Sequence, residues 1–259
     1  MSELVKVSID EGIATFILNR PKAANSLSLE LVKEFSEGLM MCRRNQEIRC
    51  IVLTGAGDRV FCAGADLKER ASMNDQQVQE TVATIGEAVS LVEKIPQPTI
   101  AAINGTALGG GMELILACDI RIASEHALFG LPETSLGIIP GAGGTQRLPR
   151  LIGSGRAKEL IYTGKKITAH EAREYGLVEY VTHQNQVLEK AYEMASSISR
   201  NAPIAIRQAK RVINCGVEVA LEDGLELEKE AYHYTIPTDD RKEGLLAFKE
   251  KRKPVYKGK

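Results

Sequence analysis

Residues Asn104–Gln146 read NGTALGGGMELILACDIRIASEHALFGLPETSLGIIPGAGGTQ, and the rest of the chain is organised around this stretch. A glycine triplet, Gly109–Gly111, leads into an apolar run that predicts a buried helix, and Glu113 lies two residues inside that run. A second carboxylate, Glu133, follows twenty residues later, after a short apolar segment and a proline. Two acids therefore share one glycine-rich neighbourhood.

The residue types in this stretch predict acid–base chemistry beside a developing negative charge. Burying an unpaired carboxylate in an apolar helix is costly, so such a group usually has a purpose. Two carboxylates in different environments can divide into a proton donor and a base. Glycines at a helix entrance let backbone N–H groups approach a ligand and stabilise an oxyanion. A simpler alternative stays open, in which Glu113 only favours the helix dipole and the glycines only form turns.

The composition of the chain is that of an ordinary globular protein. It has 259 residues, 44% of them hydrophobic and 26% charged, which fits one large domain or one domain with an appendage. A net charge of −1 gives no basic field for nucleic acid or an anionic membrane, so neither partner is expected.

The cysteines and the absence of targeting signals predict a cytoplasmic location. The five cysteines are scattered and form no CxxC pair, which indicates a reducing compartment and small buried apolar side chains. The N-terminus begins with strand-like alternation instead of a signal core, and no apolar run reaches the ~18 residues of a membrane span.

The hydrophobic pattern predicts an α/β body that becomes almost wholly helical from Thr145 onward. Two runs around Asp10-Glu11-Gly12 predict a hairpin, and Gly55–Lys68 reads as a loop. The expected strands are Val5–Ile9, Ile13–Leu18, Cys50–Thr54, Thr99–Ile103, Asp119–Ala123 and Ala127–Gly130. The expected helices run from Ser26 or Ser28 to about Arg44, over Gln77–Ile95, from near Gly110, and over Gly155–Thr163, Ala169–Tyr175, Gln186–Arg200, Pro203–Cys215, Val217–Tyr234 and Thr238–Lys251.

Common cofactor and metal motifs are incomplete or missing in the sequence. Gly55-Ala56-Gly57 follows a strand, but Val60 stands where a dinucleotide fingerprint needs its third glycine. No Gly-Lys-Ser/Thr turn, Gly-x-Ser-x-Gly elbow, HExxH motif or Cys/His cluster occurs. The four histidines are isolated, so surface or capping roles are expected for them, and no metal site is predicted.

Five segments together resemble the enoyl-CoA hydratase/isomerase family, also called the crotonase family. The resemblance extends over essentially the whole chain, including the opening NRPKAANSLS. The segments are FCAGADLKE (Phe61–Glu69), GGGMEL (Gly109–Leu114), ACDIRIAS (Ala117–Ser124), FGLPETSLGIIPGAGGTQRLPR (Phe129–Arg150) and EGLLAFKEKRKP (Glu243–Pro254). This resemblance implies an α/β fold: a spiral core of ββα units over residues 1–200. The C-terminal helical region, residues 201–259, is then expected to pack subunits into a homotrimer or homohexamer.

The resemblance also implies roles for individual residues. The oxyanion hole maps to the backbone N–H groups of Ala65 and Gly110, which stabilise enolate charge on a thioester oxygen. Glu113 and Glu133 match the two catalytic carboxylates, which hold one water between them and titrate as a coupled pair. Glu113 helps to deprotonate this water for attack at C3, and Glu133 supplies the proton to C2. The backbone N–H of Gly141 is expected to orient the same water.

Coenzyme A is part of the acyl-CoA thioester substrate in this chemistry, so no separate cofactor is expected. Lys251 or its neighbours in the basic tail are candidates for contacts with CoA phosphates of a neighbouring subunit, although the tail also reads as a solvated end. The predicted substrate-binding residues, which act mainly through backbone contacts, are Lys22, Ala24, Ala63, Ala65, Asp66, Leu67, Lys68 and Gly110.

Because members of the family that catalyse other reactions often lack one of the two glutamates, the resemblance with both present implies hydration of the C2=C3 bond of a short-chain 2-enoyl-CoA to a 3-hydroxyacyl-CoA. An isomerase that uses one glutamate stays open. So does an RNA-binding protein on the same scaffold, although the mixed charges of Ser28–Arg44 argue against it.

A narrower resemblance, to 3-methylglutaconyl-CoA hydratases, lies in GADLKERASM (Gly64–Met73) and in the last segment, Thr235–Lys259. The acyl-chain preference stays open. Met73, Leu136, Ile139 and the Gln77–Ile95 helix are candidates for the pocket wall. Arg70 is either a partner for a distal carboxylate or a solvated side chain.

Overall fold

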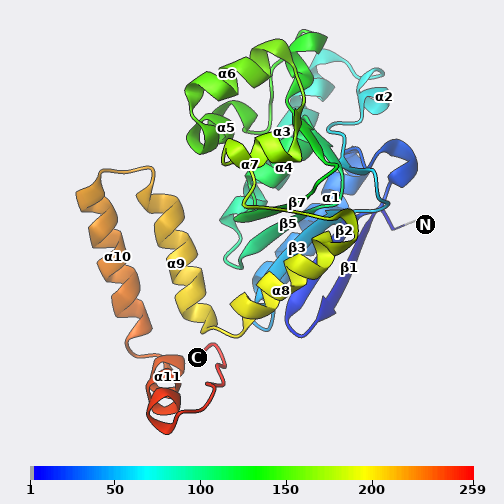
Figure 1. Cartoon of the computed structure of the whole chain (residues 1–259). Helices are drawn as coiled ribbons and strands as arrows, with labels where there is room; N and C mark the ends of the chain where they lie inside the picture. The colour runs from blue at the N-terminus through cyan, green and yellow to red at the C-terminus, as the bar shows by residue number, and fades with distance from the viewer. Residues whose placement is uncertain (1–2) are drawn as a thin grey trace.

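Two β-sheets form the centre of the molecule in the computed structural model, which describes residues 3–259 (Figure 1). The predicted hairpin is confirmed: β1 (Val5–Asp10) pairs antiparallel with β2 (Ile13–Leu18). Its turn has positive φ at Glu11 and Gly12, as a two-residue hairpin turn requires.

Three successive strand pairs generate the spiral, because the first strand of each pair joins one sheet and the second joins the other. The six-stranded sheet has the order β1-β2-β3-β5-β7-β10, and the four-stranded sheet has the order β4-β6-β8-β9. All pairings except β1–β2 and β8–β9 are parallel. The added strands are β3 (Cys50–Gly55), β4 (Val60–Cys62), β5 (Thr99–Ile103), β6 (Thr106–Leu108), β7 (Ile120–Ser124), β8 (Leu128–Gly130), β9 (Ile167–Thr168) and β10 (Tyr180–Thr182).

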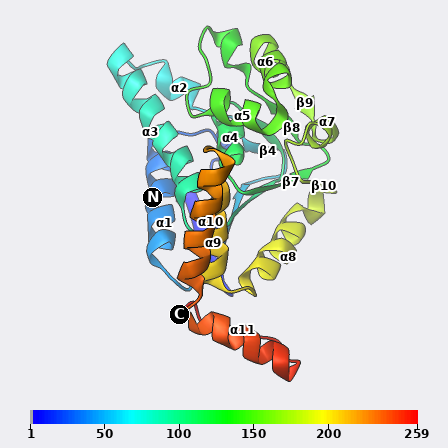
Figure 2. The same cartoon turned by 90° about the vertical axis from the view of Figure 1, so that its left-hand side faces the viewer.

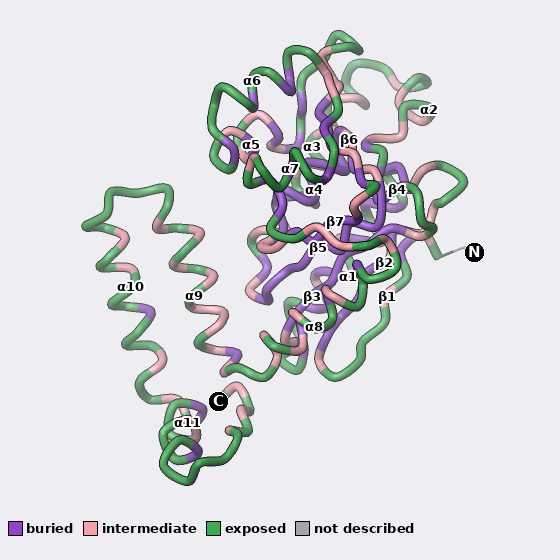
Figure 3. Tube along the Cα trace, viewed as in Figure 1, coloured by how far each residue is buried: buried purple, intermediate pink, exposed green. Residues whose placement is uncertain are grey.

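Helices cover both faces of the larger sheet, which explains the continuous apolar runs of its inner strands. Every residue of β3 and β5 is buried, and the purple trace of Figure 3 is concentrated in the body. On one face α8 (Val187–Ser199) packs against β2, β3, β5 and β7. On the other, α1 (Leu29–Arg44), capped by Ser28, packs against β1, β2 and α3 (Asp75–Lys94).

The C-terminal helices extend away from this body (Figures 1 and 2). Helix α9 (Pro203–Gly216) packs against α10 (Leu221–Thr235), and α11 (Asp239–Glu250) follows at the far end. Large apolar side chains on this extension are exposed, Phe248 by 87% and Leu221 by 77%. Among the described residues, no helix has the length and hydrophobicity of a membrane span.

The structure corrects the predicted elements in four places. The predicted loop Gly55–Lys68 contains β4, and β6 is an additional strand. The described chain after Thr145 is mainly helical, as predicted, but it also contributes the short strands β9 and β10, which join the two sheets. Strands of two or three residues carry too little alternation to be recognised in a sequence. The remaining helices are α2 (Leu67–Arg70), α4 (Gly110–Leu116), α5 (Gly144–Ile152), α6 (Ser154–Thr163) and α7 (Ala169–Glu174), with 3₁₀ turns at Pro21–Ala23, Pro132–Leu136 and Gln184–Gln186.

Two helix boundaries differ for identifiable reasons. Helix α3 begins at Asp75, ahead of the predicted Gln77, because Asn74 and Gln77 form a capping box. Helix α10 begins at Leu221 instead of Val217, because α9 continues through Gly216 and a turn separates the two helices. The capping box is a signal that the sequence contained.

Candidate active site

Helix α4 carries Glu113 into the interior, where the residue is 3% exposed. The glycines at the start of α4 are required because the backbone of this helix lies very close to the backbone of β4. A Cβ on Gly111 would lie 2.2 Å from the backbone oxygen of Cys62, so α4 contacts β4 without an intervening side chain. Gly109, before the helix, has φ +51°, a conformation that side chains disfavour. The glycine triplet therefore fixes the position of Glu113 against the smaller sheet.

The turn Pro140–Gly144 receives the carboxylate of Glu113. Its Oε1 atom accepts hydrogen bonds from the backbone N–H groups of Ala142 at 2.7 Å and Gly144 at 2.8 Å. A Cβ on Gly144 would lie 3.1 Å from the same oxygen, so only glycine leaves ordinary room for the carboxylate there. Neither donor was among the predicted site residues, because residue type does not mark a backbone N–H donor and the resemblance assigned only those of Ala65, Gly110 and Gly141.

Glu133 lies on the 3₁₀ turn Pro132–Leu136 and faces the glycine triplet. A Cβ on Gly109 would lie 3.0 Å from its Oε1 atom. Its Oε2 atom is buried and has no hydrogen-bond partner among the described residues. Glu113 and Glu133 line the same cavity, so the structure brings the two predicted carboxylates together.

The two carboxyl groups have different electrostatic environments. Burial raises the pKa of Glu113, but the N–H groups of Gly144 and Ala142 and the charge of Arg147 act in the opposite direction. Burial and the charge of Glu113 raise the pKa of Glu133 to about 7, despite an opposing effect of Arg70. The pair is therefore asymmetric: the pKa of Glu133 is raised to about 7, whereas two N–H donors favour the ionised form of Glu113.

The backbone N–H groups of Ala65 and Gly110 lie beside each other at the cavity wall. A Cβ on Gly64 would lie 3.1 Å from the nitrogen of Gly110, and a Cβ on Gly110 would lie 3.6 Å from the nitrogen of Ala65. Neither N–H group donates to another group of residues 3–259. Two adjacent donors without acceptors form the geometry expected of an oxyanion hole.

The cavity that these groups share has a volume of about 200 Å³. This is below the ~300–1,000 Å³ of pockets for drug-sized ligands, so the cavity suits a short acyl group. The predicted Gly141, Leu136 and Ile139 lie on its wall, and α3 contributes Val78, Val82 and Ile85. Met73, also a candidate, contacts Thr81 of α3 and is not a lining residue.

The predicted substrate-binding residues separate into two groups. Ala63, Ala65, Leu67 and Gly110 line the cavity, whereas Lys22, Ala24, Asp66 and Lys68 do not. The carboxylate of Asp66 is already engaged, since it pairs with Arg20 at 2.9 Å and caps α2. This pairing, with the helix-cap hydrogen bonds, lowers the pKa of Asp66 against the effect of burial. Its role, apart from any backbone contact with substrate, is to hold the loop in place.

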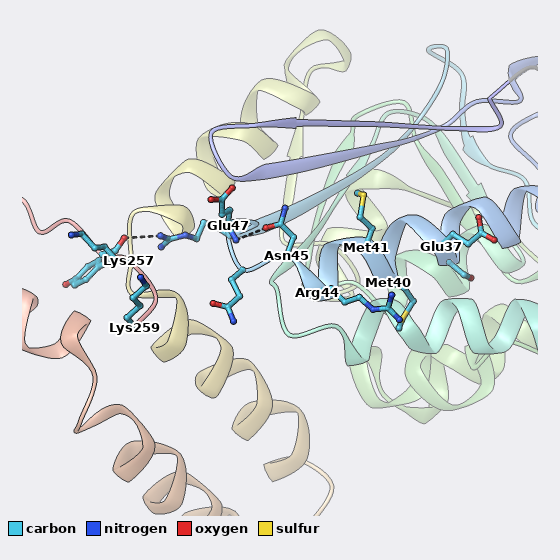
Figure 4. Close-up of a pocket in the computed structure, with 12 residues that line it drawn as sticks. Glu37, Met40, Met41, Arg44, Asn45, Glu47, Lys257 and Lys259 are labelled. Carbon is cyan, nitrogen blue, oxygen red and sulfur yellow. Dashed lines mark hydrogen bonds between the residues drawn. The ribbon is translucent and has the colours of Figure 1, made fainter.

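A second hollow, of about 1330 Å³, is an open groove between the end of α1 and the C-terminal segment (Figure 4). Its wall mixes Glu37 and Glu47 with Arg44 and Lys257, and it contains none of the predicted site residues. A hydrogen bond from Arg49 to the backbone oxygen of Tyr256 connects its two sides. The groove lies apart from Glu113 and Glu133, which line the smaller cavity.

The cysteines and histidines stand apart from this site. Four cysteines are buried, as predicted, while Cys215 is exposed. Burial raises the pKa of Cys62 to about 12, which leaves this thiol inert. Within residues 3–259, no group of three or more His, Cys, Asp or Glu side chains is arranged to hold a metal ion.

An α/β spiral with two carboxyl groups beside paired N–H donors defines an acyl-thioester enzyme of the crotonase type. The profile of the family described as enoyl-CoA hydratase/isomerase matches residues 8–259, and the chain belongs to that family. Enzymes of this family act on acyl-CoA thioesters, and the hydratase resemblance found in the sequence is confirmed.

Individual relatives agree with this assignment. The putative enoyl-CoA hydratase/isomerase YngF of Bacillus subtilis (strain 168) is 58% identical over 249 residues, 96% of each chain. The human mitochondrial methylglutaconyl-CoA hydratase is 48% identical over 253 residues, which are 96% of this chain and 75% of the human protein. The crystal structure of an enoyl-CoA hydratase from Bacillus anthracis has a TM-score of 0.98 at 56% identity and covers 99% of this chain and 100% of that one.

Proposed function

We propose that this enzyme adds water across the C2=C3 bond of a short-chain 2-enoyl-CoA and releases the 3-hydroxyacyl-CoA. One observation carries the proposal: Glu113 and Glu133 line a single cavity with the free N–H groups of Ala65 and Gly110. Hydration needs a base, an acid and an oxyanion site, and these four residues supply all three.

In this mechanism the thioester oxygen accepts hydrogen bonds from Ala65 and Gly110. The ionised Glu113 takes a proton from water while the water oxygen bonds to C3, and the π electrons move onto the thioester oxygen as an enolate. The enolate collapses as C2 takes a proton from Glu133. The pair gains one proton and loses one, and transfer of a proton from Glu113 to Glu133 restores the starting state.

The electrostatics support this division of roles. Two N–H donors favour the carboxylate form of Glu113, as a base requires. A pKa of about 7 keeps a large fraction of Glu133 protonated at neutral pH, as an acid requires. Removing one donor of such an oxyanion hole costs on the order of 3 kcal/mol of transition-state stabilisation. Gly141, on the cavity wall, is the proposed donor that orients the water.

We further propose 3-methylglutaconyl-CoA as a substrate. The support is the 48% identity to the human methylglutaconyl-CoA hydratase together with the small size of the cavity. The backbone of four residues outside the cavity is proposed to bind the CoA part of the substrate. These residues are Lys22, Ala24, Asp66 and Lys68.

The test is turnover of crotonyl-CoA and 3-methylglutaconyl-CoA, followed by loss of the conjugated-thioester absorbance and by product mass. Glu113→Gln and Glu133→Gln are each expected to lower kcat by about 10²–10⁴-fold with an intact fold. Glu87→Gln, on the exposed face of α3, is the matched control. Preserved turnover in either active-site variant would refute the mechanism. A product without the mass of an added water would identify an isomerase.

We also propose that the chain forms a homotrimer or homohexamer through α9, α10 and α11. The support is the exposed apolar side chains of this extension, since a monomer rarely leaves so many uncovered. Light scattering coupled to gel filtration would measure the mass directly. A monomer at micromolar concentration would contradict the proposal.

A further inference from the structure

We propose that Arg70 binds a carboxylate at the far end of the acyl chain, so that the enzyme selects 2-enoyl-CoA thioesters of dicarboxylic acids. This inference rests on the proposed hydratase function and assigns the residue that sets its specificity. It depends on where Arg70 lies, on its missing partner, and on the chemistry of the cavity around it.

The short helix α2 holds Arg70 at the cavity wall. The first turn of the helix is attached to the body, because Asp66 caps its first N–H groups and pairs with Arg20 at 2.9 Å. The neighbouring acid, Glu69, is turned away and accepts a hydrogen bond from the backbone of Leu29 at 3.1 Å. Arg70 therefore lines the cavity on an anchored element and is not paired with the adjacent carboxylate.

The guanidinium of Arg70 lacks a counterion among the described residues. Its Nε atom is buried without a hydrogen-bond partner, and no ion pair of residues 3–259 includes it. A buried polar group without a partner is costly and is usually satisfied by a ligand or water. The Nε–H group of Arg70 therefore needs an acceptor, and a negatively charged acceptor stabilises it best.

Neither of the two acids in the cavity supplies this acceptor to Arg70. Glu113 is engaged by the backbone of Ala142 and Gly144, and Arg147 supplies its nearby positive charge. Glu133 is close enough for the charge of Arg70 to act on it; with a pKa of about 7, about half of this carboxyl is protonated at pH 7, and the protonated form, which acts as the acid, is neutral. A guanidinium beside a neutral carboxylic acid remains available for a substrate anion.

Apart from Arg70 and the two glutamates, the side chains on the cavity wall are apolar, which makes the cation the element of selectivity. Val78, Val82, Ile138 and Leu136 offer no other polar group to an acyl chain. In the proposed mechanism the thioester is held at the N–H donors and Glu133 protonates C2, so the carboxylate of a carboxymethyl group on C3 is proposed to meet Arg70 on the wall of the same cavity. A planar guanidinium binds a carboxylate through two parallel hydrogen bonds, whereas a methyl group there gains nothing from the charge.

The experiment compares two substrates that differ only by this carboxylate, crotonyl-CoA and glutaconyl-CoA, in the wild type, Arg70→Met and Arg70→Lys. We expect the wild type to prefer glutaconyl-CoA in kcat/KM. Arg70→Met should lose about 10- to 100-fold with glutaconyl-CoA, and far less with crotonyl-CoA, because one charged hydrogen-bonded pair is removed. Arg70→Lys should lose less, since it keeps the charge. Lys94→Met, at the far end of α3, makes the same charge change and should alter neither.

A role limited to tuning Glu133 makes a different prediction, and the pH profile separates the two. If Arg70 acts only through Glu133, Arg70→Met shifts the pH–rate profile and lowers kcat equally for both substrates. Equal losses, or a wild type without preference, would overturn the inference while leaving hydration of crotonyl-CoA intact.

Calorimetry with the unreactive glutaryl-CoA and butyryl-CoA makes the test independent of turnover. Tighter binding of glutaryl-CoA to the wild type, lost in Arg70→Met, supports the carboxylate site even if neither unsaturated substrate is hydrated. Equal dissociation constants for the two ligands would refute it, whatever the hydratase assay gives.

Discussion

Replacing Glu133 with glutamine is expected to stabilise the enzyme while inactivating it, and the stabilisation should depend on pH. The folded protein raises the pKa of this carboxyl from 4.5 to about 7. Between these values the unfolded chain has released the proton while the folded chain still holds it. The folded state therefore loses stability as the pH rises from about 4.5 to 7, and then remains at the lower level. Glutamine has the same shape and no proton to lose, so it escapes this penalty.

The size of the effect follows from the shift. A change in pKa from 4.5 to about 7 corresponds to a free energy of about 3 kcal/mol. This is an upper limit, because Glu133 is only partly buried and water screens its charge. We therefore expect Glu133→Gln to be about 1–2 kcal/mol more stable than the wild type at pH 8, and equal to it at pH 4.5.

Urea unfolding of both proteins at pH 4.5, 6 and 8, at one fixed protein concentration, measures this difference. Glu87→Gln, on the solvent face of α3, provides the same chemical change without burial and should show no comparable trend. A gain in stability that is the same at all three pH values would show that the penalty does not come from ionisation of Glu133. A loss of stability at pH 8 would refute the electrostatic reasoning outright.

Three further predictions concern the framework of the site. Gly111→Ala should prevent correct folding, because its Cβ would lie 2.2 Å from the backbone oxygen of Cys62; far-UV circular dichroism and solubility check this, and a native-like, active variant would contradict it. Asp66→Ala should cost about 1 kcal/mol or more through loss of the α2 cap and the Arg20 pair, measured as a lower Tm, and an unchanged Tm would exclude that anchoring role. Asp240→Ala should release the C-terminal segment, because its buried carboxylate accepts hydrogen bonds from the backbone of Lys257 at 2.7 Å and Gly258 at 2.8 Å; limited proteolysis should then cut this segment faster, and an unchanged rate would argue otherwise.

Much of the larger sheet and most long helices were predictable from the sequence. The continuous apolar runs Cys50–Thr54 and Thr99–Ile103 are strands in the structure, because residues buried on both faces leave no polar alternation. Ser28 caps α1, as its residue type indicates. The short strands β4, β6 and β9 were not predicted, since two or three residues form strands only when neighbouring strands are available.

The candidate site likewise contains some residues that were identifiable from the sequence and others that only the structure revealed. Glu113 was identifiable because a carboxylate in an apolar helix breaks the pattern around it, and the structure places it in the interior. Its donors at Ala142 and Gly144 were not identifiable, since almost every residue carries a backbone N–H group. Arg70 was an open alternative between a substrate partner and a solvated side chain, and the structure places it at the cavity wall.

The sequence by itself determined the family, the α/β class and the two acids. Side-chain type and spacing along the chain are local properties, so they can be read from the sequence without the fold. Only the tertiary structure decided which groups face one another. Ala65 and Gly110 are far apart in the chain, and their N–H groups become a pair only because α4 contacts β4 through glycine. The tertiary structure also sets the environments of the two carboxyl groups, since burial raises the pKa of Glu133 to about 7, whereas two backbone donors at Glu113 oppose the effect of burial there.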